Sequence, residues 1–246
     1  MSKRSIHVDL HMHSCLSPCG DAEMTPANIV GLASLSGLDA IALTDHNISL
    51  NVGAAMRAGE AYGVTVVPGM ELETTEEVHV VCLFPDLETL TSFQQTVSDS
   101  YTQIDNKPEI FGEEIIMDEE DNILGYYPHL LLTPTGISID DVIPMVSEMG
   151  GIAYPAHVDR DSYSVLSNLG AMPYGYPYGF AEISYECDID ALYEKFPFMK
   201  DYTLIHASDA HYPAFIADPG ALLEVEELSP RGIIEALKTL QRGLIL

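Results

Sequence analysis

The stretch Ile-His-Val-Asp-Leu-His-Met-His at residues 6–13 decides the fold, because an alternating apolar run ends there in two histidines. Side chains of a β-strand point to the same face at every second residue, so His11 and His13 leave one face together. Two imidazoles are thereby directed at one cation. If this pair stood alone, the simpler explanation would be a polar strand face on which two histidines happen to meet. The rest of the sequence decides between this explanation and a metal site.

Residues of metal-ligating types recur beside later predicted strands. Asp45 and His46 follow residues 41–44, Glu71 follows 64–70, His79 lies within 78–81, His157 follows 152–156, and Asp209 and His211 follow 203–208. Sheets with helical crossovers build their sites at the carboxyl ends of parallel strands. We therefore expect one site to collect these side chains, with Asp21 as a further candidate.

Strand and helix patterns alternate along most of the chain. Thr25 and Pro26 have the positions of an N-cap and a first helical residue. We expect helices over 26–36, 50–62, 86–104, 139–148, 162–169 and 231–242, and further strands over 38–44, 180–184 and 222–226. Such βαβα units predict a parallel sheet in an α/β fold.

The alternation breaks at about residues 105–136. Residues 113–124 read as a polar turn between two short apolar segments, which favours a hairpin. The segment is either an insertion over the mouth of the site or a surface excursion. We expect residues 1–246 to form a single domain that carries this insertion.

The motifs D-L-H-M-H-S (9–14), T-D-H-N (44–47), G-M-E (69–71), A-H (156–157) and S-D-A-H (208–211) together resemble the PHP family, the polymerase and histidinol phosphatase superfamily. They occur in the family's order and span nearly the whole chain. The resemblance implies a distorted, seven-stranded barrel of the TIM type, (β/α)7, with up to three metal ions at the carboxyl ends of its strands. It also implies a metal-dependent phosphoric ester hydrolase.

By this resemblance, the metal ligands fall into three sets. The first set is His11, His13, Glu71 and Asp209; the second is Glu71, which bridges, with His79 and His157; the third is Asp21, His46 and His211. The loop that carries Asp21 is longer here than in many relatives, and we choose this residue because Thr25 and Pro26 follow at the usual interval. Zn²⁺, Mn²⁺ and Fe²⁺ all suit these donors, so we expect two or three divalent ions of open identity.

The composition limits the partners. The chain of 246 residues has 38 acidic and 10 basic residues and a formal charge of −28, which disfavours long nucleic acid. A small phosphorylated substrate remains compatible, because bound cations would dominate the charge of the site. No apolar stretch is long enough for a membrane helix and no signal region is evident, so we expect a cytoplasmic protein.

A thiolate metal site at Cys15 and Cys19 is an alternative to the histidine and carboxylate site, but the chain has no second cysteine pair at a matching spacing.

Three residues are candidates for catalysis: Asp209, His206 and Arg160. His206 could protonate a leaving oxygen or be a packed strand residue, and Arg160 could bind a phosphate or pair with Asp159 or Asp161. Asp9 and Asp45 are expected to orient imidazoles. The leading hypothesis is a phosphoesterase that hydrolyses a small phosphorylated metabolite or nucleotide through a metal-bound hydroxide. The alternatives are a non-catalytic metal-binding regulatory or structural module and a nuclease acting on short nucleic-acid ends.

Overall fold

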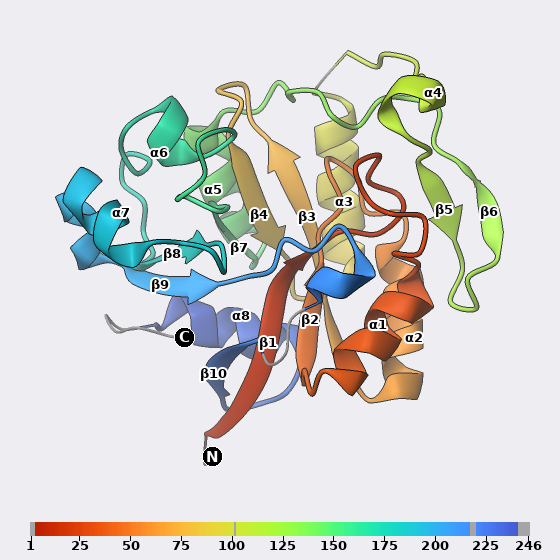
Figure 1. Ribbon diagram of the computed structural model, residues 1–246, viewed down its shortest axis with the longest axis horizontal. Helices are drawn as coiled ribbons and strands as arrows, with labels where there is room; N and C mark the ends of the chain where they lie inside the picture. Colours follow the sequence, from red (N-terminus) through yellow and green to blue (C-terminus); the bar gives the residue numbers. More distant parts are fainter. Residues whose placement is uncertain (1–2, 101, 217–219, 241–246) are drawn as a thin grey trace.

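The computed structural model describes residues 3–100, 102–216 and 220–240 and contains one large curled sheet. Its strand order is β10-β1-β2-β3-β4-β7. These strands are β1 (Arg4–Met12), β2 (Ala40–Leu43), β3 (Thr65–Glu73), β4 (His79–Leu83), β7 (Ile152–Pro155) and β10 (Ala221–Val225). A parallel pair, β8 (Phe180–Ile183) and β9 (Thr203–His206), forms a second sheet at one side (Figure 1).

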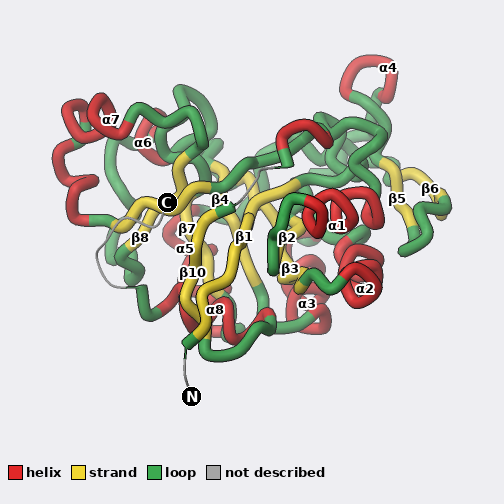
Figure 2. The backbone as a smooth tube through the Cα atoms, turned by 60° about the horizontal axis from the view of Figure 1, so that its bottom comes forward, coloured by secondary structure: helices red, strands yellow, loops and turns green. Residues whose placement is uncertain are grey.

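Backbone contacts connect the two sheets into a distorted barrel. The Val158 N–H donates to Glu182 O between the ends of β7 and β8, at 2.9 Å. On the other side, Met12 pairs with Ala210, which follows β9. Seven strands (β1, β2, β3, β4, β7, β8 and β9) thus curl around a common interior (Figure 2). The predicted α/β class and distorted TIM-like barrel are confirmed.

The expectation of an all-parallel sheet is wrong for β4. This strand is antiparallel to both β3 and β7, with Glu73 opposite His79. Only five residues separate those two positions, which is too few for the crossover that a parallel strand needs. The reversal places the start of β4 at the carboxyl end of β3. The edge strand β10 is also antiparallel to its neighbour, β1.

The helices begin within three residues of the predicted positions. Thr25, Asp86, Ser138 and Ser229 each accept a hydrogen bond from a backbone N–H of the first turn. The helices are α1 (Pro26–Leu35), α2 (Val52–Tyr62), α3 (Leu87–Ser98), α5 (Ile139–Glu148), α6 (Val165–Asn168) and α8 (Pro230–Lys238). Two are shorter than expected, because α3 ends at Ser98 and α6 is a single turn. The predicted end of the last helix lies outside the described residues.

Four short elements were not predicted from the sequence. They are α4 (Pro108–Phe111), α7 (Ile189–Lys195) and two turns of 3-10 helix, η1 (Pro197–Asp201) and η2 (Pro213–Phe215). Within the described residues, no helix is long and apolar enough to cross a membrane.

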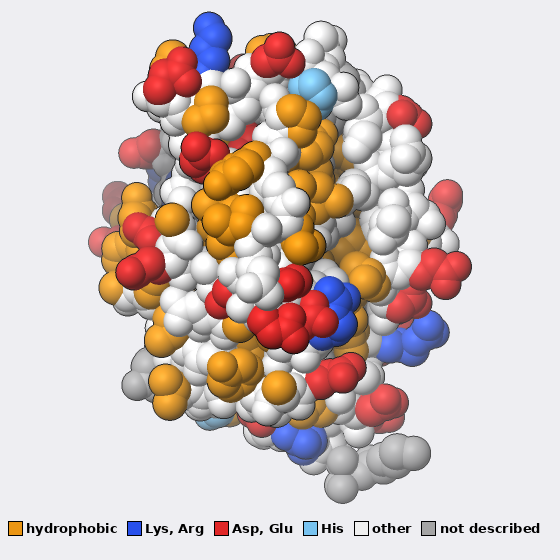
Figure 3. Space-filling model, turned by 90° about the vertical axis from the view of Figure 1, so that its right-hand side faces the viewer, with side chains coloured by type: hydrophobic (Ala, Val, Ile, Leu, Met, Phe, Trp, Pro, Cys, Tyr) orange, Lys and Arg blue, Asp and Glu red, His pale blue; other side chains and the backbone are white. Residues whose placement is uncertain are grey.

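The predicted hairpin consists of β5 (Ile115–Met117) and β6 (Ile123–Tyr126). It packs beside α1 and α2 (Figure 1): the Asp121 carboxylate accepts from the Thr25 hydroxyl at 2.6 Å, and Arg57 pairs with Glu119 at 2.7 Å. The same segment also meets the loop after β1, where the Ile115 N–H donates to Cys15 O at 2.9 Å, so both interpretations of the insertion stay open. On the same side of the molecule, apolar side chains gather between acidic ones (Figure 3).

Candidate metal centre

His11 lies near the end of β1 and His13 directly follows this strand, and both side chains are fully buried. Their Nε2 atoms lie 3.1 Å apart. Each outer nitrogen has a polar neighbour: His11 Nδ1 is 2.9 Å from Glu182 Oε1, and His13 Nδ1 is 3.0 Å from Ser17 Oγ. The two Nε2 atoms therefore face one shared space, as the alternation of the strand predicts.

Glu71, near the end of β3, lies among five imidazoles. Its Oε1 is 3.0 Å from His79 Nδ1, 3.2 Å from His11 Nε2 and 3.3 Å from His157 Nε2, and its Oε2 is 3.0 Å from His46 Nδ1 and 3.2 Å from His13 Nε2. Each carboxylate oxygen thus has its own group of histidines. A carboxylate divided in this way can bridge two cations.

Asp209 completes the group around the two strand-end histidines. Its Oδ1 is 3.3 Å from His11 Nε2, 3.1 Å from His13 Nε2 and 3.4 Å from His211 Nδ1. Its Oδ2 accepts a hydrogen bond from Arg160. His11, His13, Glu71 and Asp209 thereby form the first predicted set, with their ligand atoms within 4.8 Å of one another.

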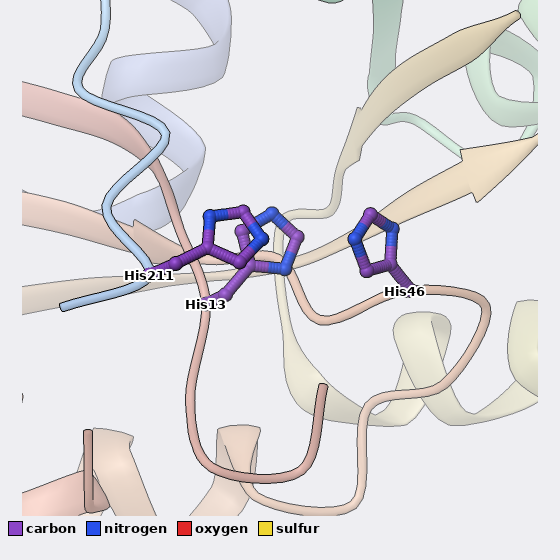
Figure 4. Close-up of side chains that lie close together, drawn as sticks. All are labelled: His13, His46 and His211. Carbon is purple, nitrogen blue, oxygen red and sulfur yellow. The ribbon is translucent and has the colours of Figure 1, made fainter. Parts of the chain in front are cut away.

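A second and a third group share members with the first. Glu71 and His79 lie together as predicted, joined by His46, and His157 approaches the same carboxylate. The third group is His13, His46 and His211, which come from the loops after β1, β2 and β9 (Figure 4). The rings of His13 and His211 stack with centroids 4.1 Å apart.

Asp21 is beside the third group but outside it. Its N–H donates to His211 O at 2.8 Å, and its carboxylate accepts from the Glu23 N–H at 2.8 Å. Its carboxylate belongs to none of the three groups that could hold an ion. The role of Asp21 as a metal ligand stays a prediction.

The loops that deliver these ligands adopt unusual backbone conformations. His157 and Asp209 have φ values of 27° and 49°, and Asn47, next to His46, has 55°. Side chains other than glycine seldom occupy this left-handed region, and such strain concentrates at functional sites. At Asn47 the side chain explains part of it, because its amide donates to Leu131 O and Thr133 O and accepts from the Glu73 N–H.

The protonation of the histidines differs across the cluster. Burial lowers the pKa of His13, but the adjacent carboxylates of Asp209 and Glu71, 3.1 and 3.2 Å from its Nε2, outweigh it and raise the pKa to about 9. Burial lowers the pKa of His46 to about 3 and, with the nearby charge of His13, that of His211 to about 4. The last two imidazoles are neutral at pH 7 and hence available as ligands.

The donor set fits divalent cations. Glu71 Oε1 and Asp209 Oδ1 are buried and receive no hydrogen bond of acceptable geometry, although imidazole nitrogens surround both. A buried unpaired polar atom costs about 1–3 kcal/mol. Nitrogen and oxygen donors that converge without bonding one another have the arrangement that a bound cation satisfies.

Glu182 is a polar residue at the centre that sequence reasoning missed. It lies in β8, is buried, and places Oε1 at 2.9 Å from both His11 Nδ1 and the His157 N–H. A carboxylate at Nδ1 keeps the proton there and leaves the Nε2 lone pair for a cation. The available signal was an acidic residue within an otherwise apolar strand.

Asp45 and Asp9 do not orient imidazoles directly, contrary to expectation. Asp45 accepts hydrogen bonds from Ser14 and from the Ser17 hydroxyl, at 2.7 and 2.8 Å, and Ser17 Oγ in turn contacts His13. Asp9 accepts from the backbone N–H groups of His11 and Ser208. Asp45 therefore acts on the cluster through Ser17.

Of the two other candidates for catalysis, Arg160 contacts the cluster, whereas the contacts found for His206 lie outside it. Arg160 pairs with Asp209, and not with either flanking aspartate, so its guanidinium lies at the edge of the cluster. The contacts found for His206 are with Ser184 O, at 3.2 Å, and with the ring of Tyr185. Its predicted role as a proton donor is untested.

A cavity of about 560 Å³ adjoins the cluster. Its described lining is Cys19, Arg160, Tyr185, Glu186, Ser208, Asp209, His211, Tyr212, Ala214 and Phe215. A volume of this order suits a small ligand.

All four cysteines are free thiols, and none belongs to a group that could hold an ion among the described residues. The alternative of a thiolate metal site at Cys15 and Cys19 is therefore without support.

Comparison with known proteins agrees with the motifs. The model of the PHP domain family matches residues 9–163, more than half of the sequence. The chain therefore belongs to the PHP domain family. It is 27% identical over 208 residues to phosphoribosyl 1,2-cyclic phosphate 1,2-diphosphodiesterase of Eggerthella lenta, covering 65% of this chain and 78% of that protein.

Two further similarities extend over different lengths. An uncharacterized protein of Methanocaldococcus jannaschii is 32% identical over 98 residues, 36% of this chain and 57% of its own. The structure of endonuclease Q from Pyrococcus furiosus superposes with a TM-score of 0.70 at 20% identity, covering 98% of this chain. The chain spans 58% of that endonuclease, and the likeness concerns the fold.

Proposed function

We propose that this chain is a metal-dependent hydrolase of phosphate esters that acts on a small phosphorylated metabolite or nucleotide. The observation that carries the proposal is the buried Glu71 carboxylate, whose two oxygens face separate groups of histidines. Membership of the PHP family and the diphosphodiesterase activity named for the relative from Eggerthella lenta support the same reaction class.

The ligands we assign are those predicted from the sequence, with Glu71, His13 and His46 each shared between two groups. Two or three divalent cations held there would supply an activated water and would neutralise charge on the phosphate oxygens. Glu182 and Ser17 hold the outer nitrogens of His11 and His13, so that their inner nitrogens are fixed before a cation arrives. Zinc, manganese and iron all suit this donor set.

Arg160 is our candidate for contact with the substrate phosphate. Its guanidinium lines the 560 Å³ cavity and pairs with Asp209 at the same time. A guanidinium presents several N–H donors in one plane, so one can remain on Asp209 while others reach a phosphate oxygen. The side chain is 41% exposed, which leaves it accessible from the cavity.

A nuclease acting on nucleic-acid ends is the second candidate function. The fold similarity to endonuclease Q, one structure of which is a complex with duplex substrate, favours it. The charge of −28 opposes it, since polyanion binding relies on many basic contacts. We therefore place small phosphate esters first.

The test combines metal analysis with a substrate panel. Purified protein is assayed with Zn²⁺, Mn²⁺ or Fe²⁺ against aryl phosphate, phosphorylated metabolites, nucleotides and short oligonucleotides. We expect hydrolysis of a small ester that His13→Ala abolishes without unfolding the chain. His129→Ala is the matched control, because His129 contacts Asp105 and Tyr127 away from the cluster.

Each outcome separates the candidates. Cleavage of oligonucleotides in preference to small esters would establish the nuclease. Bound metal without turnover of any substrate would indicate the non-catalytic module, and a chain that binds no metal would overturn the proposal.

A further inference from the structure

Three aromatic side chains line the cavity beside the metal centre. Tyr185, Tyr212 and Phe215 are 40%, 48% and 60% exposed, although aromatic side chains are usually buried. They come from two separate loops, one directly after β8 and the other at η2. An apolar surface left in water next to charged groups is typical of a ligand site.

Contacts with neighbouring rings hold these aromatic side chains in place. The Tyr185 ring lies nearly parallel to His206, with centroids 5.4 Å apart and planes at 9°. Tyr212 and Phe215 meet edge to face, at 5.9 Å and 84°. Both arrangements are favourable for aromatic pairs. His206 thereby has a function in supporting Tyr185 that needs no proton transfer.

The polar groups of the cavity limit the ligand further. Arg160 is the one basic side chain among the described lining residues, whereas Glu186 adds negative charge. One guanidinium beside the cluster suits a single phosphate, and a carboxylate disfavours additional phosphates. Glu186 and Ser208 can instead bond hydroxyl groups such as those of a sugar.

We infer that Tyr185, Tyr212 and Phe215 bind the planar base of a nucleoside monophosphate whose phosphate reaches the metal centre. The inference rests on the proposed function and names its substrate class. Stacking on aromatic side chains tolerates any base, since every base has a π face. The site would then discriminate strongly between phosphate esters with and without a planar ring, and only weakly between one base and another.

The experiment compares AMP with ribose 5-phosphate, in which a hydroxyl group takes the place of the base. Wild-type protein, Tyr212→Leu, Phe215→Leu and the double variant are assayed with the same metal. Leucine keeps apolar bulk and removes the ring. Tyr174→Leu is the matched control, because Tyr174 is 97% exposed and does not line this cavity.

We expect the wild type to prefer AMP and the double variant to raise the KM for AMP about 10-fold, the size of effect that loss of a base stack produces. Kinetics with ribose 5-phosphate should not change. Equal kinetics for the two substrates in the wild type, or equal losses for both in the variant, would overturn the inference.

Adenosine binding provides a readout that needs no turnover. Saturation-transfer NMR should detect adenosine on the wild type and a weaker signal on the double variant. If no ester is hydrolysed with any metal, the proposed function fails while this measurement still tests the aromatic site. Adenosine that does not bind the wild type would refute the site even if another phosphate ester is hydrolysed.

Discussion

Replacing Glu182 by glutamine tests whether metal affinity depends on the charge of a carboxylate that contacts the proposed ligands and is not itself one of them. Glu182 Oε1 lies 2.9 Å from His11 Nδ1 and 2.9 Å from the His157 N–H, so it links a proposed ligand in β1 with another in the loop after β7. Glutamine keeps the shape and one carbonyl acceptor. The substitution therefore removes the charge and preserves most of the packing.

The magnitude follows from the type of hydrogen bond. A bond to a charged group contributes about 1.5–3 kcal/mol and a neutral bond about 0.5–1.5 kcal/mol. The difference, about 1–1.5 kcal/mol, corresponds to an affinity about 10-fold weaker. Loss of a partner that orients a metal ligand typically weakens binding by about 10- to 100-fold, so Glu182→Ala should lie toward the upper part of that range.

The assay is a competition titration of Zn²⁺ or Mn²⁺ against a chelating dye, with thermal unfolding of the metal-free chain as the control for folding. Glu114→Gln is the matched variant, because Glu114 is another buried carboxylate that accepts a backbone N–H, from Leu131 at 3.0 Å, outside the cluster. Only Glu182→Gln should weaken metal binding. Equal affinities for the two variants would refute the reasoning.

Four further predictions address the same centre and its surroundings. Glu71→Gln should lower bound metal, measured by elemental analysis, more than His211→Ala does; equal losses would argue against a bridge. Because the pKa of His13 is about 9 without metal, metal uptake at pH 7 should release a proton, and the apparent affinity for metal should rise toward pH 9. Calorimetry in buffers of different ionisation enthalpy measures the proton release. Burial raises the pKa of Glu114 to about 8, above its unfolded value, so stability should fall between about pH 4.5 and 8, and Glu114→Gln should flatten this dependence in thermal melts. Arg160→Ala should raise KM for an active substrate by the loss of a charge-assisted bond, about 1.5–3 kcal/mol, with metal content intact and partial rescue by lysine; unchanged kinetics would leave phosphate binding to the cations alone.

The sequence predicted much of this centre because ligand type and strand position carry the same information. His11 and His13 share a face through the period of two, and Glu71 and Asp209 lie where their strands end. Sheet geometry brings His11, His13 and Glu71 together, whereas Asp209 also depends on the conformation of the loop after β9. The loop conformations were not predictable, because positive φ at His157 and Asp209 depends on tertiary contacts rather than on residue type.

Contacts across long sequence separations were also beyond sequence reasoning. Arg160 meets Asp209, 49 positions away, rather than the aspartates beside it in sequence. Glu182 meets His11, 171 positions away, across the interior of the curled sheet, although β8 and β1 are not paired with each other. An isolated acidic residue in an apolar strand signals a buried partner, but the identity of that partner requires the fold.

His79 lies in the predicted cluster although the direction of its strand was not predicted. In a parallel strand, a histidine at the first position would lie at the amino end of the barrel, far from Glu71. The hairpin between β3 and β4 reverses the chain, so Glu73 pairs with His79 and Glu71 with Val81. The first residue of β4 thereby meets the last residues of β3, and His79 Nδ1 lies 3.0 Å from Glu71 Oε1. The five residues between Glu73 and His79 already exclude a helical crossover, so loop length is the property of the sequence that determines on which side of the barrel this imidazole lies.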